Sequence, residues 1–418
     1  MKRLFSTVVF LATTLAGMAQ MTPEEKLNMT LYAVINLYVD SVDKSKFVDY
    51  HISNMMKSLD PFSEYLAPES AKQGEMLFGD NIPQSEGKTQ TLQHKTDAKP
   101  NAPYCVNAAY MADNTTGYIS LSMFGQSSAD EVRESIRELK KQGMKSLIID
   151  LQQNGGGLVD KAVEIADEFL SKDLTVFTAR GKNVPEKVFK TSRKGMFERG
   201  RLSVLIGSGT KSAAELFAAA LKDHDRALIT GTRSFGKGLI QETLPFADGS
   251  ALRITVARYF TPKGVCIQKP YIPEQKADWG VKPDIEVAPD TLHRSSMWYN
   301  IITFSGVQTL IARTYAQEHE TELRQKYTTE EDFIRHFDSL SLFNKVLAKS
   351  DELGYERSDD DMAKCKDYVV LQLKALVGRH LYGNNCFFRV MNERNNALRQ
   401  ALASQTEKSC RRNRHSRL

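Results

Sequence analysis

The sequence predicts an α/β fold with helical segments before and after it. Between residues 104 and 290, short apolar runs alternate with amphipathic stretches of helical periodicity, which is typical of strands and helices in turn. Glycine-rich or serine-containing loops follow several of these runs. Helical spacing dominates before this region, and from about residue 291 the strand pattern disappears. We therefore expect a largely parallel inner sheet in the middle of a chain of 418 residues, which is long enough for several domains.

The first 19 residues have the pattern of a secretory signal peptide. Lys2 and Arg3 precede an apolar run of about a dozen residues, and small residues at Gly17 and Ala19 predict cleavage after Ala19. The run is too short to span a bilayer comfortably, and an uncleaved anchor is the alternative. We expect an exported protein, periplasmic or extracellular, with no integral membrane span after cleavage.

Residues 20–65 are predicted to form an N-terminal helical segment, because apolar residues recur at helical spacing until Asp60-Pro61 ends the second helix. Residues 66–103 are rich in Gly, Gln, Lys, Asn, Ser and Pro, a composition that predicts a linker.

The α/β core is predicted over residues 104–290. Ligands of parallel sheets gather at the carboxyl ends of the strands, so we expect the glycine loop 154–157 and the serine turn 208–212 to be neighbours. The predicted strands are 118–121, 146–151, 174–178, 202–206, 227–230, 240–244 and 252–259, and the predicted helices are 129–142, 158–170 and 212–223.

Residues 291–403 are predicted to form a C-terminal helical domain, with helices over 298–316, 330–347, 359–382 and 392–403. A basic tail, 404–418, follows it and is expected to be solvated. The chain carries a net charge of +5, but the signal peptide and this tail account for it. The rest is close to neutral, so charge gives no reason to expect nucleic-acid binding.

Cysteine and histidine positions predict neither a metal site nor a cofactor. The five cysteines are widely and irregularly spaced with no Cys-x-x-Cys pair, and the eight histidines form no metal-binding motif. Export permits a disulfide, for which Cys365 and Cys386 are the most local pair, while buried free thiols are the favoured interpretation.

Ser212 and Lys237 are the candidate catalytic pair. A serine hydroxyl needs a base to act as a nucleophile, and a lysine amine serves as that base only where its surroundings lower its pKa. Ser212 opens a predicted helix, and Lys237 lies in a Phe-Gly-Lys-Gly turn. The alternatives are a helix-capping serine and an exposed lysine.

Two further groups complete the candidate site. The N–H of Ala213, at the helix start, and the loop Asn154-Gly155-Gly156-Gly157 could together stabilise an oxyanion, although the loop could equally be a plain tight turn. Gln241 follows Lys237 by four residues and would share its face if this stretch were helical. A glutamine amide could orient the lysine amine without adding the charge that would keep it protonated.

The sequence does not match two other functional motifs, a phosphate-binding loop and the nucleophile elbow of α/β-hydrolases. Residues 231–238 nearly match a phosphate-binding loop, but Gly238 stands where a hydroxyl residue should hold magnesium, and Pro245 precludes the long helix. No G-x-S-x-G elbow occurs, which argues against an ordinary α/β-hydrolase.

An ordered set of motifs resembles the C-terminal processing (tail-specific) serine proteases. The resemblance covers roughly residues 115–288 closely and extends to the segment 58–63. It is carried, in this order, by Ser58-Leu59-Asp60-Pro61-Phe62-Ser63, Tyr118-Ile119-Ser120-Leu121, Ile148-Ile149-Asp150-Leu151-Gln152-Gln153-Asn154-Gly155-Gly156-Gly157, Thr210-Lys211-Ser212-Ala213-Ala214-Glu215, Gly231-Thr232-Arg233-Ser234-Phe235-Gly236-Lys237-Gly238, Ala257-Arg258-Tyr259-Phe260-Thr261-Pro262 and Gly280-Val281-Lys282-Pro283-Asp284.

The resemblance implies a crotonase-like core of the kind shared with the caseinolytic (ClpP-like) proteases. It implies a catalytic Ser212, Lys237 and Gln241, with oxyanion donors at Ala213 and Gly156. It also implies a serine endopeptidase that acts on protein or peptide substrates, and the processing of C-terminal regions as one possible activity. A homodimer is the assembly that the resemblance suggests. A catalytically silent scaffold or peptide-binding homologue on the same fold is the alternative function.

The chain departs from the family pattern in three places. Only the linker 66–103 stands where most members carry a PDZ domain of about 80 residues, too little for a complete PDZ fold. The usual Asp-Leu-Arg reads Asp150-Leu151-Gln152 here. Lys211 stands beside the nucleophile where a small residue is common; we expect it to point to solvent, the alternative being an inward ammonium near Lys237.

Overall fold

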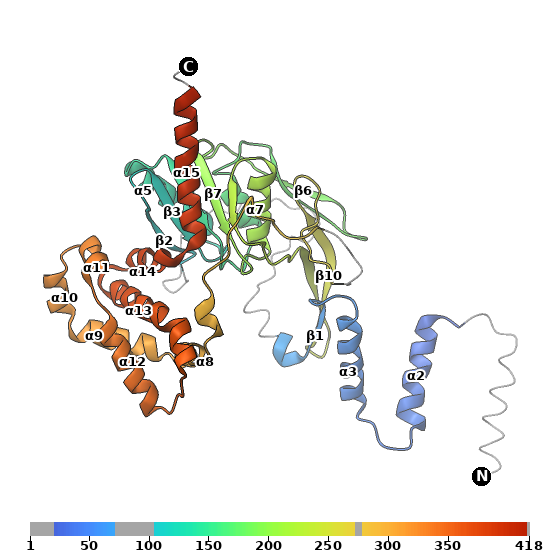
Figure 1. Cartoon of the computed structure of the whole chain (residues 1–418). Coiled ribbons are helices and arrows are strands. Elements are labelled where there is room, and N and C mark those ends of the chain that lie inside the picture. The colour runs from blue at the N-terminus through green and yellow to red at the C-terminus, as the bar shows by residue number, and fades with distance from the viewer. Residues whose placement is uncertain (1–20, 72–103, 272–277, 416–418) are drawn as a thin grey trace, which may run out of the picture. The chain divides into compact units, whose positions relative to one another are not determined.

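A computed structural model describes residues 21–71, 104–271 and 278–415; the predicted signal peptide and most of the predicted linker lie outside these ranges. The chain divides into two compact units (Figure 1). The smaller comprises Met1–Gly87 and Gln241–Thr255, and the larger comprises Lys88–Ile240 and Val256–Leu418.

The smaller unit contains two helices and an antiparallel strand pairing. Thr22 caps α2 (Pro23–Leu37) through a capping box with Glu25, and Asp43 caps α3 (Lys44–Lys57). The chain then turns at Asp60 into β1 (Glu64–Leu66), which pairs antiparallel with β10 (Ala251–Phe260). The strand β9 (Leu239–Pro245) also pairs with β10, and its residues from Gln241 onward belong to this unit.

The larger unit is built on a sheet of strand order β11-β8-β7-β4-β3-β2. The first five strands of this order run parallel, and β2 is antiparallel to β3. The predicted α/β class is therefore confirmed. The strands are β2 (Val106–Met111), β3 (Thr116–Leu121), β4 (Ser146–Asp150), β7 (Arg201–Ile206), β8 (Leu228–Gly231) and β11 (Ile285–Glu286).

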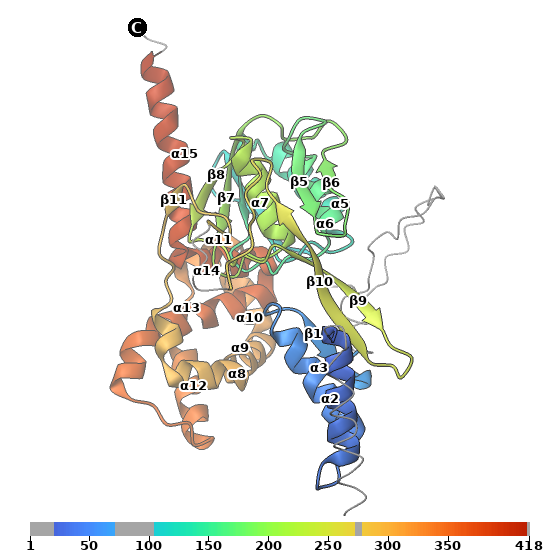
Figure 2. The ribbon, with the colours of Figure 1, turned by 90° about the vertical axis from the view of Figure 1, so that its right-hand side faces the viewer.

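Helices cover both faces of this sheet, because its strands carry buried apolar side chains on both faces. Ile149 and Val204 point to the face covered by α5 (Ser128–Lys141), α6 (Val159–Ala166) and α7 (Ala213–Asp223). Ile148 and Leu205 point to the other face, where they pack against α15 (Asn396–His415). Figure 2 shows the strands β7 and β8 between α7 and α15, and Figure 1 shows β7 between the same two helices.

A second antiparallel ribbon lies within the larger unit. The strand β5 (Thr175–Arg180) pairs with β6 (Lys187–Lys190) on one side and with the last three residues of β10 on the other. Phe177 stacks on Phe189 and meets Tyr259 edge-on, so aromatic contacts hold the ribbon together.

The C-terminal helices form their own core around the buried Trp298 and Phe333. Two helices predicted as continuous are interrupted, because Gly306 adopts a left-handed conformation and the chain turns again near Ser339. The sequence also missed α10 and α14. The elements are η1 (Leu292–Ser295), α8 (Met297–Phe304), α9 (Val307–Glu318), α10 (Glu320–Lys326), α11 (Glu330–His336), α12 (Leu340–Glu352), α13 (Asp359–Tyr382), α14 (Asn384–Met391) and η2 (Asn392–Arg394).

The last helix, α15, differs from the expected solvated tail. It continues to His415 instead of ending near residue 403. Gln405 is buried. Its side-chain oxygen accepts a hydrogen bond from the Thr116 hydroxyl at 3.3 Å, and its side-chain nitrogen donates one to the Ser203 hydroxyl at 3.3 Å. The start of the predicted tail is thus part of the sheet's packing.

Cys105, Cys266, Cys365 and Cys386 are free thiols, so the most local cysteine pair is not a disulfide. Across the described ranges, no group of histidine, cysteine or acidic residues is arranged to hold a metal ion. In the same ranges no helix combines the length and apolarity needed to cross a membrane.

Asp361 provides a test of the helical part. Its carboxylate accepts hydrogen bonds from the hydroxyls of Ser358 and Ser296, both at 2.8 Å, which caps α13 and ties it to the start of α8. These bonds, that from Ser358 foremost, lower the pKa of Asp361 from 3.8 to about 2. We predict that Asp361→Ala lowers the free energy of unfolding by about 1 kcal/mol at pH 7, the usual effect of losing a helix cap.

Because the folded-state pKa is depressed, this stabilisation is complete above pH 3.8 and is lost as the pH falls towards 2. Urea unfolding should therefore show a smaller difference between wild type and Asp361→Ala at pH 3 than at pH 7. Asp360→Ala is the control, since Asp360 forms an exposed pair with Lys364. Equal effects of the two substitutions at pH 7 would contradict the capping role.

Candidate active site

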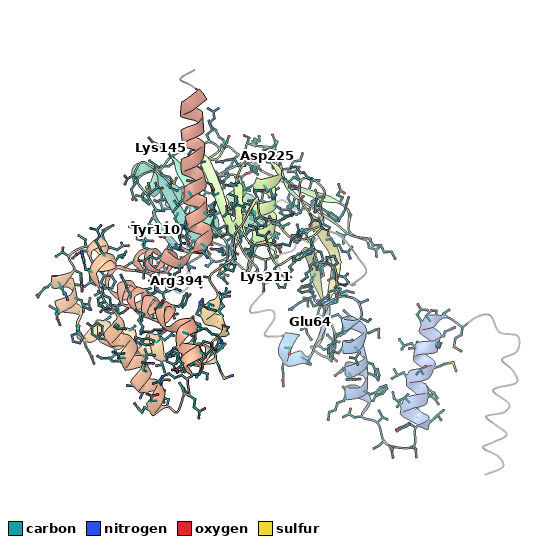
Figure 3. All side chains as sticks on the ribbon, viewed as in Figure 1. Glu64, Tyr110, Lys145, Lys211, Asp225 and Arg394 are labelled. Carbon is teal, nitrogen blue, oxygen red and sulfur yellow. The ribbon has the colours of Figure 1, made fainter. Side chains whose placement is uncertain are left out.

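The candidate site lies at the carboxyl ends of β4, β7 and β8, where the loops 151–158, 207–212 and 232–238 follow the strands. Figure 3 shows Lys211 at one end of the sheet of the larger unit and Lys145 and Asp225, which precede β4 and β8, at the other end of the sheet. The parallel direction of the strands brings these loops to one edge, as the sequence predicted.

Ser212 occupies the N-cap position of α7 in an unusual backbone conformation. Its φ of 52° and ψ of −121° differ from the extended conformation that N-cap residues normally adopt. Such a backbone costs a residue other than glycine about 1–3 kcal/mol and persists only where the surroundings enforce it. Here the Lys211 N–H donates to the Asn154 carbonyl at 3.0 Å, and the fully buried Ala213 fixes the other side.

Gly156 packs directly against this turn. A Cβ added to Gly156 would lie 2.8 Å from the Lys211 carbonyl oxygen, 2.9 Å from the Ser212 Cβ and 3.2 Å from the Ala213 nitrogen. Its φ of +99° also favours glycine. The glycine loop and the serine turn therefore approach each other as closely as a missing side chain allows.

The backbone N–H groups near Ser212 differ in whether they already have a hydrogen-bond acceptor. The Gly156 N–H donates to Asn154 Oδ1 at 2.8 Å, and the Asn154 amide in turn donates to the Leu121 carbonyl at 2.9 Å. Within the part of the chain that the structure describes, the N–H groups of Ala213 and Gly157 have no hydrogen-bond partner. Such donors at a helix start and a glycine loop can bind an anionic oxygen.

Lys237 follows β8 in a loop whose backbone is tightly held. The N–H groups of Gly236 and Lys237 donate to the two carboxylate oxygens of Glu215, at 2.6 Å and 2.8 Å. The Gly238 N–H donates to Gln268 Oε1 at 2.9 Å. The Lys237 side chain is half-buried.

Glu215 is a residue of the candidate site that the sequence did not single out. It is fully buried, and besides the two loop N–H groups it accepts from the Ser212 N–H at 2.9 Å and the Ser234 hydroxyl at 2.6 Å. Burial raises the pKa of Glu215 above 4.5, against the opposing effect of its four hydrogen bonds. One carboxylate thus joins the serine turn to the lysine loop.

A capping-box pattern at Ser212 and Glu215 is readable in the sequence. It predicts the bond to the Ser212 N–H, but gives no indication of the partners at Ser234, Gly236 and Lys237.

Gln241 lies in the smaller unit, in β9 and not in a helix, so the spacing argument that would place it on one face with Lys237 is wrong. Its amide donates to the Phe62 carbonyl at 2.5 Å. The adjoining Asp60 carboxylate accepts from the N–H groups of Phe62 and Ser63, both at 2.8 Å. The segment 58–63 and Gln241 therefore form one hydrogen-bonded group.

Lys211 does not extend freely into solvent. It is half-buried, and its Nζ lies 4.3 Å from the centroid of the Phe235 ring. The stretch after Lys237 is the strand β9, which agrees with the absence of a phosphate-binding loop and its helix.

Residues 115–287 match Peptidase family S41, and residues 298–383 match a family of unknown function, DUF8443. The match of residues 115–287, with the relatives that follow, confirms the resemblance to the C-terminal processing serine proteases.

Two relatives carry the corresponding names. A chloroplastic C-terminal processing peptidase of Tetradesmus obliquus is 34% identical over 245 residues, which cover 56% of this chain and 50% of that protein. A carboxy-terminal-processing protease of Bartonella bacilliformis is 29% identical over 319 residues, which cover 60% of this chain and 71% of that protein. The chain thus spans half the length of the first relative.

Among solved structures, the photosystem II D1 C-terminal processing protease is similar with a TM-score of 0.46 and 23% identity, over 65% of this chain and 95% of that one.

The contact at Gly156 yields a prediction. Gly156→Ala should lower the free energy of unfolding by about 2–4 kcal/mol, because the new Cβ meets backbone atoms and the positive φ disfavours alanine. The measurement is urea unfolding of the purified protein.

Gly155→Ala is the matched control, because a Cβ on Gly155 would meet nothing within 4 Å. It should change the unfolding free energy by less than about 0.5 kcal/mol. A Gly156→Ala variant as stable as Gly155→Ala would show that the loop and the serine turn are not in close contact.

Proposed function

We propose that the protein is an exported serine endopeptidase in which Ser212 is the nucleophile and Lys237 the general base. The observation that supports this proposal most directly concerns the Glu215 carboxylate. It accepts hydrogen bonds from the backbone N–H groups of Ser212 and Lys237, and so holds their two loops together. The strained backbone of Ser212 supports the same proposal, since such strain is typical of exposed nucleophiles at strand-to-helix turns.

The reaction begins when the neutral amine of Lys237 takes the proton from the Ser212 hydroxyl. The Ser212 oxygen then attacks the peptide carbonyl, and a tetrahedral oxyanion forms. Lys237 returns the proton to the leaving amine, the C–N bond breaks, and an acyl-enzyme remains. Water, deprotonated by Lys237, releases the acid product and regenerates Ser212.

The oxyanion is stabilised by backbone N–H groups. Ala213 supplies the first donor, which is supported by its position after Ser212 and by the lack of a partner for its N–H in the described residues. Gly156 supplies the second by exchanging its bond to Asn154 Oδ1 for one to the oxyanion. In the low dielectric of a partly buried site, each such donor contributes about 3–4 kcal/mol to the transition state.

Gln241 is retained as the third catalytic residue on the family resemblance. Its amide is held by the Phe62 carbonyl, beside the Asp60 turn of the family's N-terminal motif.

The substrates we propose are proteins or peptides, with processing of C-terminal regions suggested by the names of the two relatives. A predicted linker in place of a PDZ domain leaves substrate choice to surfaces other than that domain. Export rests on the signal-peptide pattern of residues 1–19, and the homodimer stays a prediction from the family resemblance.

Ser212→Ala and Lys237→Ala should each reduce cleavage of an unstructured protein by at least about 10³-fold, because each removes one half of the nucleophile–base pair. The measurements are cleavage, followed by mass spectrometry, and labelling with a fluorophosphonate probe, which modifies activated serines.

Ser208→Ala, an exposed serine in the same turn, is the control and should retain both activities. Full cleavage by Ser212→Ala would refute the assignment. A wild-type protein that neither cleaves nor becomes labelled would favour the silent scaffold.

Glu215→Gln should abolish probe labelling even where the variant remains folded. The amide replaces one acceptor oxygen by an N–H₂ donor, which then faces backbone donors of the serine turn or the lysine loop. We expect a loss of about 2 kcal/mol in unfolding free energy as well, since buried donors lose their acceptor.

Glu168→Gln is the control that separates loss of probe labelling from loss of stability. Glu168 is a fully buried carboxylate in the same unit that pairs with Arg133 and Arg193. This variant should lose comparable stability and keep labelling at equal folded fraction. Loss of labelling in both variants, or in neither, would contradict a specific role for Glu215 in the site.

A further inference from the structure

Cationic and aromatic side chains alternate around the lysine loop of the larger unit. Lys211 Nζ lies 4.3 Å from the Phe235 ring centroid, and the Trp279 ring has Lys269 Nζ and the Arg233 guanidinium carbon each at 4.9 Å. These distances are within the range of cation–π attraction, which holds each charged head over a ring face.

The charges differ in how they are compensated. Arg233 donates to the Asp278 carboxylate at 2.8 Å and to the Trp279 carbonyl at 2.7 Å. Within the described ranges, neither Lys211 nor Lys269 has a carboxylate partner. Two ammonium groups near the candidate site are thus neutralised by no protein charge of the described chain.

Backbone contacts connect these groups to the catalytic loops. The Phe235 N–H donates to the Thr210 carbonyl at 3.0 Å, so the ring under Lys211 adjoins the serine turn. A Cβ on Gly236 would lie 2.8 Å from the Trp279 ring and 2.9 Å from the Lys269 Cβ, so both residues of the second cation–π pair pack against the residue before Lys237. Lys211 itself is the residue before the proposed nucleophile.

We propose that Lys211, assisted by Lys269, binds a carboxylate of the substrate close to the bond that is cleaved, so that the enzyme prefers acidic peptide segments. This inference rests on the proposed peptidase function and names the substrate class of that site. A half-buried ammonium held over a ring loses part of its hydration, which strengthens its hydrogen bond to a carboxylate. Lys211 is then a specificity-determining residue.

The test compares two fluorogenic peptides of one sequence that differ only in having Glu or Gln next to the cleaved bond, placed on either side in turn. The wild type should show a higher kcat/KM for the Glu peptide, by about three- to tenfold for a partly exposed charge pair. Lys211→Gln should remove this preference, so that its kcat/KM values for the Glu and Gln peptides become equal. A third peptide carries Lys at the same position, and Lys211→Glu should show a higher kcat/KM for this Lys peptide than for the Glu peptide.

Lys145→Gln is the matched control. It removes the same charge from the same unit at the opposite end of the sheet, as Figure 3 shows, and should leave the preference intact. Raising the ionic strength should reduce the preference of the wild type, because salt screens partly exposed charges.

Equal cleavage of the Glu and Gln peptides by the wild type would overturn the inference and leave the peptidase function standing. A Lys211→Gln variant that loses activity equally on both peptides would also overturn it, since Lys211 would then act on the catalytic groups. A wild type that cleaves no peptide and is not labelled by the fluorophosphonate would overturn the proposed function and the inference together.

Discussion

The buried carboxylate of Glu215 is the interaction on which the candidate site depends. Burying an ionised carboxylate is costly unless every oxygen finds donors, and here one donor from the serine turn and three from the lysine loop converge on it. Because these donors belong to segments far apart in the sequence, satisfying the carboxylate requires the serine turn and the lysine loop to adopt their positions together. The site is therefore a consequence of a local electrostatic requirement as much as of the fold.

The parallel sheet supplies the frame in which this requirement can be met. Strands β4, β7 and β8 end at one edge, so the loops that follow them are neighbours before any side chain is considered. Gly156 then allows the loop after β4 to press against Ser212, and the backbone of Ser212 is turned into a conformation that a free chain avoids. Rigid packing on both faces of the sheet offsets this strain.

The sequence was most informative where structure depends on local patterns. Apolar runs such as 146–151 and 202–206 predicted β4 and β7, and the family motifs singled out Ser212, Lys237 and the glycine loop. It was least informative where structure depends on distant partners. The partners of Glu215 lie about twenty residues away, and α15 extends past residue 403 because Gln405 packs on strands some 200 and 290 residues earlier. Gln241 could not be placed by spacing, since its stretch is a strand held by Phe62, and the ring that Lys211 meets is likewise non-local.

The most direct test of the central claim is a crystal structure of the protein with a peptide boronate, which forms a tetrahedral adduct with an activated serine. The adduct is expected on Ser212 Oγ, with one boronate oxygen within hydrogen-bond distance of the Ala213 N–H and of the glycine loop at Gly156, and with Glu215 still bonded to both loops. An adduct on another residue, or a boronate oxygen on Ser212 directed away from Ala213, would contradict the proposed site.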